Sequence, residues 1–175
     1  MKERIETDRL ILRKLKKSDV ESMFKNWDND PIVAQYTFWV AHKSVEETKK
    51  LVDMWLEEEK EGKVIRFVIT EKDSDEPIGS IDTFEFVNDV PEIGYCLARK
   101  HWNKGYMSEA CNAFVDYLFE LGYKKILVRA DVRNTASLKV IEKCGFTFTH
   151  EEFVEHRSIF RPESVTLRWY EINKK

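Results

Sequence analysis

Two patterns of hydrophobic and polar residues divide the chain into predicted strands and helices. Short stretches rich in β-branched residues and leucine, bounded by turn sequences, are typical of strands. The predicted strands are 8–15, 64–70, 78–87, 92–98, 124–132, 146–154 and 164–172. Only short turns separate the three strands predicted at 64–70, 78–87 and 92–98. An antiparallel meander is therefore predicted over 64–98.

A helical period appears in two segments of the N-terminal third. Ser18 or Asp19 can cap a first helix that runs to about Trp27. Ser44 and Glu47 have the spacing of a capping box, in which each residue satisfies a free end group of the other. The apolar residues that follow at helical spacing predict a second helix, which ends before Gly62.

Two more helices follow in the C-terminal half. Apolar residues recur every three or four positions from Met107, and Gly122 marks the end of this helix. A shorter helix over 136–144 ends at Gly145 in the same way. The predicted order is β-α-α-β-β-β-α-β-α-β-β. This order indicates an α+β fold with about four helices packed on a mixed, mostly antiparallel sheet of about seven strands.

Composition narrows the class of protein. A chain of 175 residues is expected to form a single domain, 1–175. With 42% hydrophobic and 35% charged residues it has the composition of a globular protein, and no stretch approaches the roughly 20 apolar residues of a membrane helix. The N-terminal residues lack a secretory signal, so the cytoplasm is the expected compartment. The net charge of −3 argues against nonspecific nucleic-acid binding.

Cysteine and histidine residues predict neither disulfides nor a metal site. The three cysteines, Cys96, Cys111 and Cys144, are odd in number and show no Cys-x-x-Cys spacing. The four histidines lie too far apart in the sequence to form a local ligand pair. Buried free thiols and no metal ion are therefore expected.

The stretch HWNKGYMSEACNA, residues 101–113, places one glycine directly before a predicted helix. A helix start presents main-chain N–H groups without internal partners and a partial positive charge, which together favour a phosphate. Gly105 would let the main chain approach such an anion without a Cβ atom. Lys104 either adds charge or points to solvent, and Ser108 either donates its hydroxyl or caps the helix. A plain loop glycine explains the position equally well, because both common nucleotide-binding glycine motifs are absent.

The wider context of this glycine resembles the pyrophosphate-binding loop of the GCN5-related N-acetyltransferase (GNAT) superfamily. The likeness is closest to the branch of ribosomal-protein N-terminal acetyltransferases (RimJ/RimL type). The matching positions are Trp102, Lys104, Gly105, Tyr106, Ser108, Glu109 and Ala110. A second block, RNTASLKVIEKCGF, resembles the family's Asn-x-x-Ser helix start and Glu-Lys-x-Gly-Phe ending, and TDRLILRKL and EIGYCL also match. Met107 stands where the superfamily has a small residue, so its side chain must turn away from the phosphate.

The resemblance implies acetyl-coenzyme A as cosubstrate and a set of residues that hold it. The pyrophosphate would lie on the main-chain N–H groups of Asn103, Lys104, Gly105, Tyr106, Met107 and Ser108. The pantetheine arm would pair with the strand edge at Cys96, Leu97, Ala98 and Arg99. Asn134 caps the short helix, hydrogen-bonds the pantetheine arm, or does both. Gly94 indicates either a bulge that splays this strand or a position where packing requires no side chain.

Acyl transfer to an amine needs a base, a donor to the thioester oxygen and an acid for the departing thiolate. Glu92 is the candidate base, with a solvated carboxylate at the strand end as the alternative. Ser137 is the candidate acid, or else it hydrogen-bonds the sulfur. Tyr95 is a second candidate acid or a core aromatic, because Thr147 stands where many relatives have a catalytic tyrosine. A main-chain N–H at the predicted bulge would bind the oxygen.

Other side chains enter the site only if the last strands line it. Glu152, Glu155 and His156 could then serve the amine. Tyr36, Phe38 and Trp39 could line a pocket, pack beneath their loop or form a homodimer contact, and the sequence does not decide between these roles. Cys144 has no cationic neighbour in its helix-end setting that would activate it as a nucleophile.

The expected activity is transfer of an acetyl group from acetyl-CoA to a primary amine, on a protein N-terminus or a small molecule, by direct attack in a ternary complex. No membrane or nucleic-acid partner is expected. A noncatalytic acyl-CoA sensor or scaffold with the same fold is the main alternative, and a nucleotide-phosphate binding module is a further one.

Overall fold

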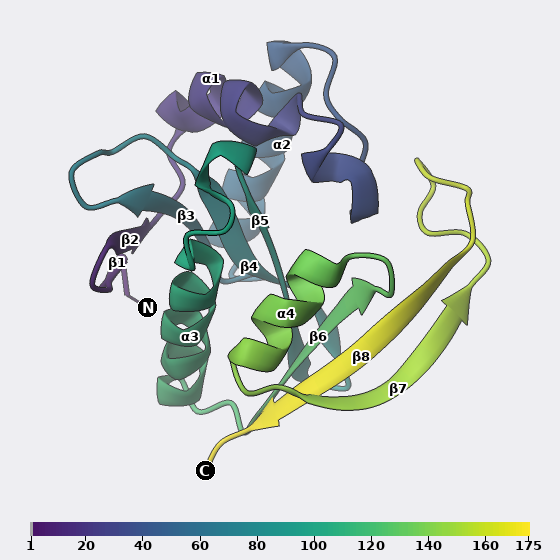
Figure 1. Cartoon of the computed structure of the whole chain (residues 1–175). Coiled ribbons are helices and arrows are strands. Elements are labelled where there is room, and N and C mark those ends of the chain that lie inside the picture. Colours follow the sequence, from purple (N-terminus) through teal and green to yellow (C-terminus); the bar gives the residue numbers. More distant parts are fainter. Residues whose placement is uncertain (1) are drawn as a thin grey trace.

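The computed structural model describes residues 2–175, which form one eight-stranded sheet with helices on both faces (Figure 1). Along the sheet the strands follow the order β1-β2-β3-β4-β5-β6-β8-β7. The strands are β1 (Arg4–Glu6), β2 (Leu10–Arg13), β3 (Arg66–Glu71), β4 (Gly79–Val87), β5 (Val90–Leu97), β6 (Lys125–Asp131), β7 (Thr147–Val154) and β8 (Val165–Asn173). All neighbouring pairs are antiparallel except β5 and β6.

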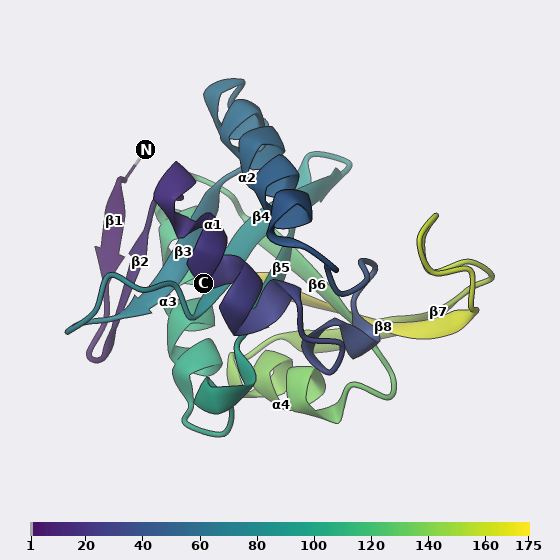
Figure 2. The same ribbon diagram turned by 90° about the horizontal axis from the view of Figure 1, so that it is seen from above.

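The helices form two layers that cover opposite faces of the sheet, as Figure 2 shows. One layer holds α1 (Val20–Met23) and α2 (Val45–Lys60), and the other holds α3 (Tyr106–Glu120) and α4 (Thr135–Lys143). Phe114 and Leu118 of α3 and Ile141 of α4 are fully buried in the larger core, whereas Trp27 and Val52 belong to a second core beneath α2. Among the described residues, no helix is long and apolar enough to cross a membrane.

The two halves of the sheet separate between β5 and β6. β4 and β5 pair from Gly79↔Leu97 down to Val87↔Val90. In contrast, the parallel pair β5–β6 makes a single bridge, Glu92↔Leu127. Beyond this bridge the strands diverge toward the starts of α3 and α4 (Figure 1). The opening between β5 and β6 leaves one edge of β5 without a strand partner, and it is the feature that positions the site.

The first predicted strand, 8–15, corresponds to β2 and is shorter than expected, and a further strand, β1, precedes it without having been predicted, which accounts for eight strands instead of seven. The break between the two strands falls in a turn at 7–9, where the Thr7 N–H donates to the Leu10 carbonyl (3.0 Å) and the Thr7 hydroxyl is bonded to Glu109 (2.6 Å). This distant carboxylate stabilises the turn, and the local pattern of residues does not reveal it. The predicted α+β fold is otherwise confirmed.

The starts of the two early helices also differ from the prediction. The first helical segment begins at Lys17 with a 3₁₀ turn, continues as α1 and ends in a π-helical turn over Phe24–Asp28. The Asp19 carboxylate reaches back to the Lys16 N–H (2.8 Å), so Ser18 is not the cap. Ser44 does precede α2, but its side chain makes no capping bond. Glu47 accepts from the Lys43 N–H (2.9 Å) instead, and the predicted capping box is absent.

The predicted bulge at Gly94 is wrong. The irregularity lies on the partner strand β4, between Thr83 and Glu85, where Phe84 is the extra residue. A Cβ atom on Gly94 would lie only 3.0 Å from the Phe84 ring, so the glycine makes room for this aromatic side chain. The packing interpretation of Gly94 is therefore the correct one, and the separation of β5 from β6 does not depend on a bulge in β5.

Candidate active site

The loop before α3 has the geometry of an anion-binding helix start. Gly105 is the N-cap residue and has a φ of +77°, a conformation that favours glycine. The first helical bond runs from the Glu109 N–H to the Gly105 carbonyl (3.1 Å), and no side chain caps this end. The N–H groups of Tyr106, Met107 and Ser108 therefore have no partner within the helix. They are free to bind an anion such as a diphosphate.

A carboxylate anchors this loop to the N-terminal hairpin. Glu109 accepts hydrogen bonds from the Thr7 hydroxyl (2.6 Å) and from the Arg9 N–H (2.8 Å), and it pairs with the Arg9 guanidinium (2.7 Å). The same guanidinium donates to the Lys104 carbonyl (2.8 Å). These contacts give the TDRL and SEA sequences a shared structural role. Thr7 and Arg9 of the first hold Glu109 of the second in place at the start of α3.

The other motif residues in this loop have structural contacts. The Trp102 indole N–H donates to the Leu97 carbonyl (2.7 Å) and ties the loop to the end of β5. Met107 turns into the core, as the sequence required, and Ser108 is also buried, so its predicted capping role is wrong. The Lys104 ammonium lies 5.8 Å from the Tyr106 ring centre, at the mouth of the loop.

The free edge of β5 can be located from the hydrogen bonds on its other side. The Ala98 N–H donates to the Ile78 carbonyl (2.8 Å). The main-chain groups of Ala98 and of every second residue before it therefore face β4. Alternation then directs the main-chain groups of Tyr95 and Leu97 toward the opening. Of the predicted edge, Leu97 offers its N–H there, whereas Cys96 and Ala98 face β4 and the Arg99 side chain pairs with Asp30. Tyr95, which the edge prediction did not include, provides both an N–H and a carbonyl.

The start of α4 lies across the opening from this edge. Asn134 caps α4 by accepting the Ser137 N–H (3.2 Å), which confirms its predicted capping role. The Ser137 hydroxyl is 2.9 Å from the Tyr95 phenol oxygen. Burial raises the pKa of the Tyr95 phenol, so this group stays protonated near neutral pH. The structure thus brings both candidate acids together, although 42 residues separate them in the sequence.

Glu92 lies at the bottom of the opening and is fully buried, so the interpretation as a solvated strand-end carboxylate is wrong. Arg129 of β6 places its Nε atom 2.8 Å from Glu92 Oε1. No donor among residues 2–175 makes a well-directed hydrogen bond to either carboxylate oxygen. Burial raises the pKa of Glu92 to about 7, against the lowering effect of Arg129. A carboxylate with this pKa can exchange a proton near neutral pH.

Arg129 pairs with Glu92 and itself lies against two aromatic residues, and the sequence analysis missed all three. The Arg129 guanidinium lies 4.7 Å from the Trp169 ring centre and 5.7 Å from that of Phe84. Its Nη2 atom also reaches Glu85 (3.1 Å). A charged residue inside the β-branched stretch KILVRADV was the available signal, because a strand interior rarely holds an arginine without a partner.

The candidate side chains on β7 and in its loop differ in their relation to Glu92. Glu152 lines a cavity of about 330 Å³ and accepts a hydrogen bond from the Trp169 indole (2.8 Å). It is close enough to raise the pKa of Glu92 by charge repulsion. The cavity is lined by Val87, Leu127, Thr149, His150, Glu152, Trp169 and Glu171. His156 is instead bonded to the Pro162 carbonyl within its own loop (2.9 Å), and Glu155 is exposed.

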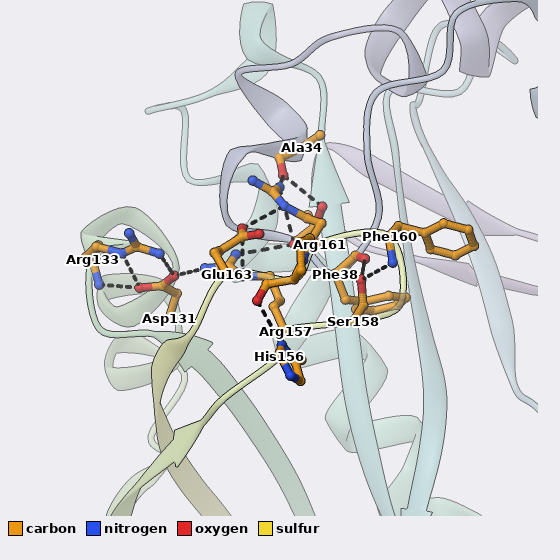
Figure 3. Close-up of polar contacts among 12 residues, drawn as sticks. Ala34, Phe38, Asp131, Arg133, His156, Arg157, Ser158, Phe160, Arg161 and Glu163 are labelled. Atoms are coloured by element: carbon orange, nitrogen blue, oxygen red, sulfur yellow. Dashed lines mark hydrogen bonds and ion pairs between the residues drawn. The ribbon is translucent and has the colours of Figure 1, made fainter.

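The loop between β7 and β8 is fastened to the segment 34–38 by arginine and serine side chains (Figure 3). Arg157 donates to the Thr37 carbonyl (3.3 Å) and pairs with the buried Asp131 at the end of β6. Arg161 donates to the Ala34 carbonyl and Ser158 to the Phe38 carbonyl. These bonds close a bridge between two segments that are distant in the sequence and define one rim of the site.

The three loop aromatics have separate roles. Phe38 stacks on Phe84 with ring centres 5.7 Å apart, and Phe84 in turn lies against the guanidinium of Arg129. Trp39 packs against the second core, and Tyr36 lies 5.8 Å from the Arg133 guanidinium. Phe38 is therefore the residue of this group that lines the site, and it does so while half exposed.

These parts fit an acyl-CoA ligand. Unpaired N–H groups at the start of α3 suit the diphosphate, and the free edge of β5 suits the amide groups of the pantetheine arm. The buried carboxylate lies where that edge ends, next to the last bridge to β6. A helix start, an open strand edge and a buried carboxylate in this spatial order are what the class of acyl-CoA-dependent transferases requires.

Comparisons with known proteins agree with this class. Residues 9–147 match the acetyltransferase (GNAT) domain family. The uncharacterized N-acetyltransferase p20 of Bacillus licheniformis is 33% identical over 147 residues, 82% of each chain. A GNAT-family acetyltransferase of Bacillus anthracis has a structure with a TM-score of 0.82 at 25% identity, covering 97% of this chain and 98% of that one. RimL, a ribosomal L7/L12 α-N-protein acetyltransferase in complex with coenzyme A, has a TM-score of 0.81 at 22% identity, covering 98% of both chains.

The chain belongs to the GNAT family of N-acetyltransferases. The motif-based resemblance to the GNAT family is confirmed, and the closer likeness to its ribosomal-protein acetyltransferase branch stays a prediction. Acetyl-CoA is accordingly the expected cosubstrate.

Proposed function

We propose that this enzyme acetylates a primary amine, on a protein N-terminus or a small molecule, by direct attack within a ternary complex. The observation that carries the proposal is the position of Glu92. This buried carboxylate, with a pKa of about 7, lies at the last bridge between β5 and β6 and directly below the free edge of β5.

Acetyl-CoA, when bound, supplies a thioester carbonyl for attack by the amine nitrogen. The N–H groups of Tyr106, Met107 and Ser108 hold its diphosphate, and the Tyr95 and Leu97 edge aligns its arm. The Tyr95 N–H is the proposed donor to the thioester oxygen, because it points into the opening. Asn134 contributes its free amide group from the start of α4.

Two groups of the chain move protons in this scheme. Glu92 accepts the proton of the acceptor ammonium at a carboxylate oxygen, which produces the nucleophilic amine. The Ser137 hydroxyl, with Tyr95 as its hydrogen-bond partner, donates to the leaving sulfur. Cys144 lies buried against the Ser108 carbonyl (3.5 Å), so an acyl-cysteine step is not part of the proposal.

Binding and turnover test the proposal together. Calorimetry is expected to detect acetyl-CoA binding, and a thiol-release assay is expected to show turnover with at least one of a Ser-Ala-Ala-amide peptide, spermidine and tyramine. Acetyl-CoA binding without thiol release across a broad amine panel would instead indicate a noncatalytic sensor. Protection against heat by ATP equal to that by acetyl-CoA would indicate a nucleotide-phosphate module.

The Tyr95–Ser137 pair makes a prediction of its own. Ser137→Ala is expected to lower kcat about tenfold, which is below the usual range for general acid–base catalysis, because a thiolate leaves readily without full protonation. Tyr95→Phe removes the partner in the same hydrogen bond, so the double variant should lose little more than Ser137→Ala alone. Single-turnover rates at saturating acetyl-CoA measure this effect.

Thr147→Ala is the matched control for these variants. Thr147 is exposed and stands where relatives have a tyrosine, so this change should leave kcat unchanged. Fully additive losses in the double variant would contradict a shared role for Tyr95 and Ser137.

A further inference from the structure

Arg129 covers the proposed base and leaves no solvent path to it. Its Nε atom is 2.8 Å from Glu92 Oε1, and the Glu92 side chain has 0% exposure while that of Arg129 has 27%. The guanidinium lies between the rings of Trp169 and Phe84. An acceptor nitrogen cannot contact Glu92 while Arg129 holds this position.

The side chain of Arg129 has a second carboxylate partner on the outer side. Its Nη2 atom is 3.1 Å from Glu85, whose side chain is 51% exposed. The main chains of β5 and β6 are fixed by the sheet, so the long arginine side chain is the part that can move. Rotation toward Glu85 would preserve one ion pair and would uncover Glu92.

The charges around Glu92 favour a cation in place of Arg129. The charged groups that act on Glu92 are Arg129 from β6, Glu85 from β4 and Glu152 from β7. Glu171 of β8 is paired with Lys125 (2.9 Å) and does not add to this set. Two carboxylates, Glu92 and Glu85, thus share one guanidinium while Glu152 adds a third negative charge nearby, and an entering ammonium would restore the charge that Arg129 removes when it rotates outward.

We propose that Arg129 is a gate and positioning residue for the acetyl transfer, whose guanidinium is exchanged for the ammonium of a cationic acceptor at Glu92. In the closed position Arg129 favours the ionised form of Glu92 against the opposite effect of burial. In the open position it pairs with Glu85, and the acceptor ammonium lies against Glu92 between Trp169 and Phe84. The inference rests on the proposed role of Glu92 as base. It implies that an acceptor with a carboxylate next to its amine is a poor substrate, because that charge would face three carboxylates.

Arg129→Gln, Arg129→Lys and Arg168→Gln test the inference through pH profiles of kcat/KM. In Arg129→Gln the acid limb is expected to move up by about one to two pH units, because the cation that favours ionised Glu92 is lost. Arg129→Lys keeps the charge and should restore the limb to near its original position. Arg168 pairs with Glu151 on the neighbouring strand and does not act on Glu92, so Arg168→Gln should have the profile of the unmodified enzyme.

Titration of Glu92 by carbon-13 NMR separates the two proposals, with Glu92→Gln used to assign the resonance. A Glu92 titration that stays in place in Arg129→Gln overturns the inference about Arg129 and leaves the base role of Glu92 intact. If the Glu92 titration shifts in Arg129→Gln but the pH profile of kcat/KM does not, the base role of Glu92 is overturned. The proposed gate role of Arg129 is then overturned with it. At pH 9 the KM of the best acceptor among the Ser-Ala-Ala-amide peptide, spermidine and tyramine should fall in Arg129→Gln, and a rise would overturn the exchange of cations.

Discussion

Glu92→Gln is expected to lower kcat for amine acetylation by about 10²- to 10⁴-fold, the range associated with loss of a general base. Since the pKa of Glu92 is about 7, kcat/KM of the unmodified enzyme should fall as the pH drops below 7, where the carboxylate is already protonated. The residual activity of the glutamine variant should lack this acid limb. Steady-state rates between pH 5.5 and 9 with saturating acetyl-CoA measure both effects.

Glu151→Gln is the matched control, because this exposed carboxylate on β7 pairs with Arg168 and does not act on Glu92. Its change should alter kcat only slightly.

Stability provides a second control. A raised folded-state pKa means that the protonated form of Glu92 stabilises the fold, and this contribution is lost as the pH rises through about 7. Glu92→Gln should therefore be at least as stable as the unmodified enzyme at pH 8. If it retains normal kcat, Glu92 is not the base.

Gly105→Asp is expected to weaken acetyl-CoA binding at least about tenfold relative to Gly105→Asn, because a full negative charge next to a phosphate costs on the order of 1–3 kcal/mol near a protein surface. The two residues have nearly the same size. Both tolerate the left-handed conformation observed at Gly105 better than other non-glycine residues, and both are good N-caps. The comparison thus isolates charge from backbone strain.

Calorimetry at low and high salt measures this difference, which should shrink as salt screens the charges. The melting temperature of Gly105→Asp without ligand should be no lower than that of Gly105→Asn, since Arg9 Nη2, at 3.4 Å, is the nearest atom that a Cβ at this position would meet and its charge favours the aspartate. Equal affinities for acetyl-CoA in both variants would show that the start of α3 does not bind the diphosphate.

Several parts of the site follow from local sequence. The glycine before α3 and the cap of α4 were predictable, because helix starts depend on residues within one turn of each other. The buried orientation of Met107 also followed, since a bulky side chain cannot face a bound phosphate. Strand and helix positions in the C-terminal half agree with the prediction to within about two residues, as expected for strongly periodic segments.

Other features depend on which segments are neighbours in space. The turn at 7–9 and the strand β1 before it were not predicted, because the Glu109 carboxylate that stabilises the turn comes from α3. The irregular residue opposite β5 proved to be Phe84 and not Gly94, since either strand of a pair can hold the extra residue and local sequence does not distinguish them.

The sequence by itself determined the family, the order of the elements apart from β1, and the glycine-led start of α3, because periodicity, helix-start signals and the GNAT motifs are local properties of the chain. Only the tertiary structure decided the chemistry of the centre. Three features arise where β5 and β6 meet and then separate. These are the burial of Glu92, its pairing with Arg129 and the contact between Tyr95 and Ser137. The pKa of a carboxylate is set by desolvation and by nearby charges, and both depend on strands that the chain brings together only when it folds.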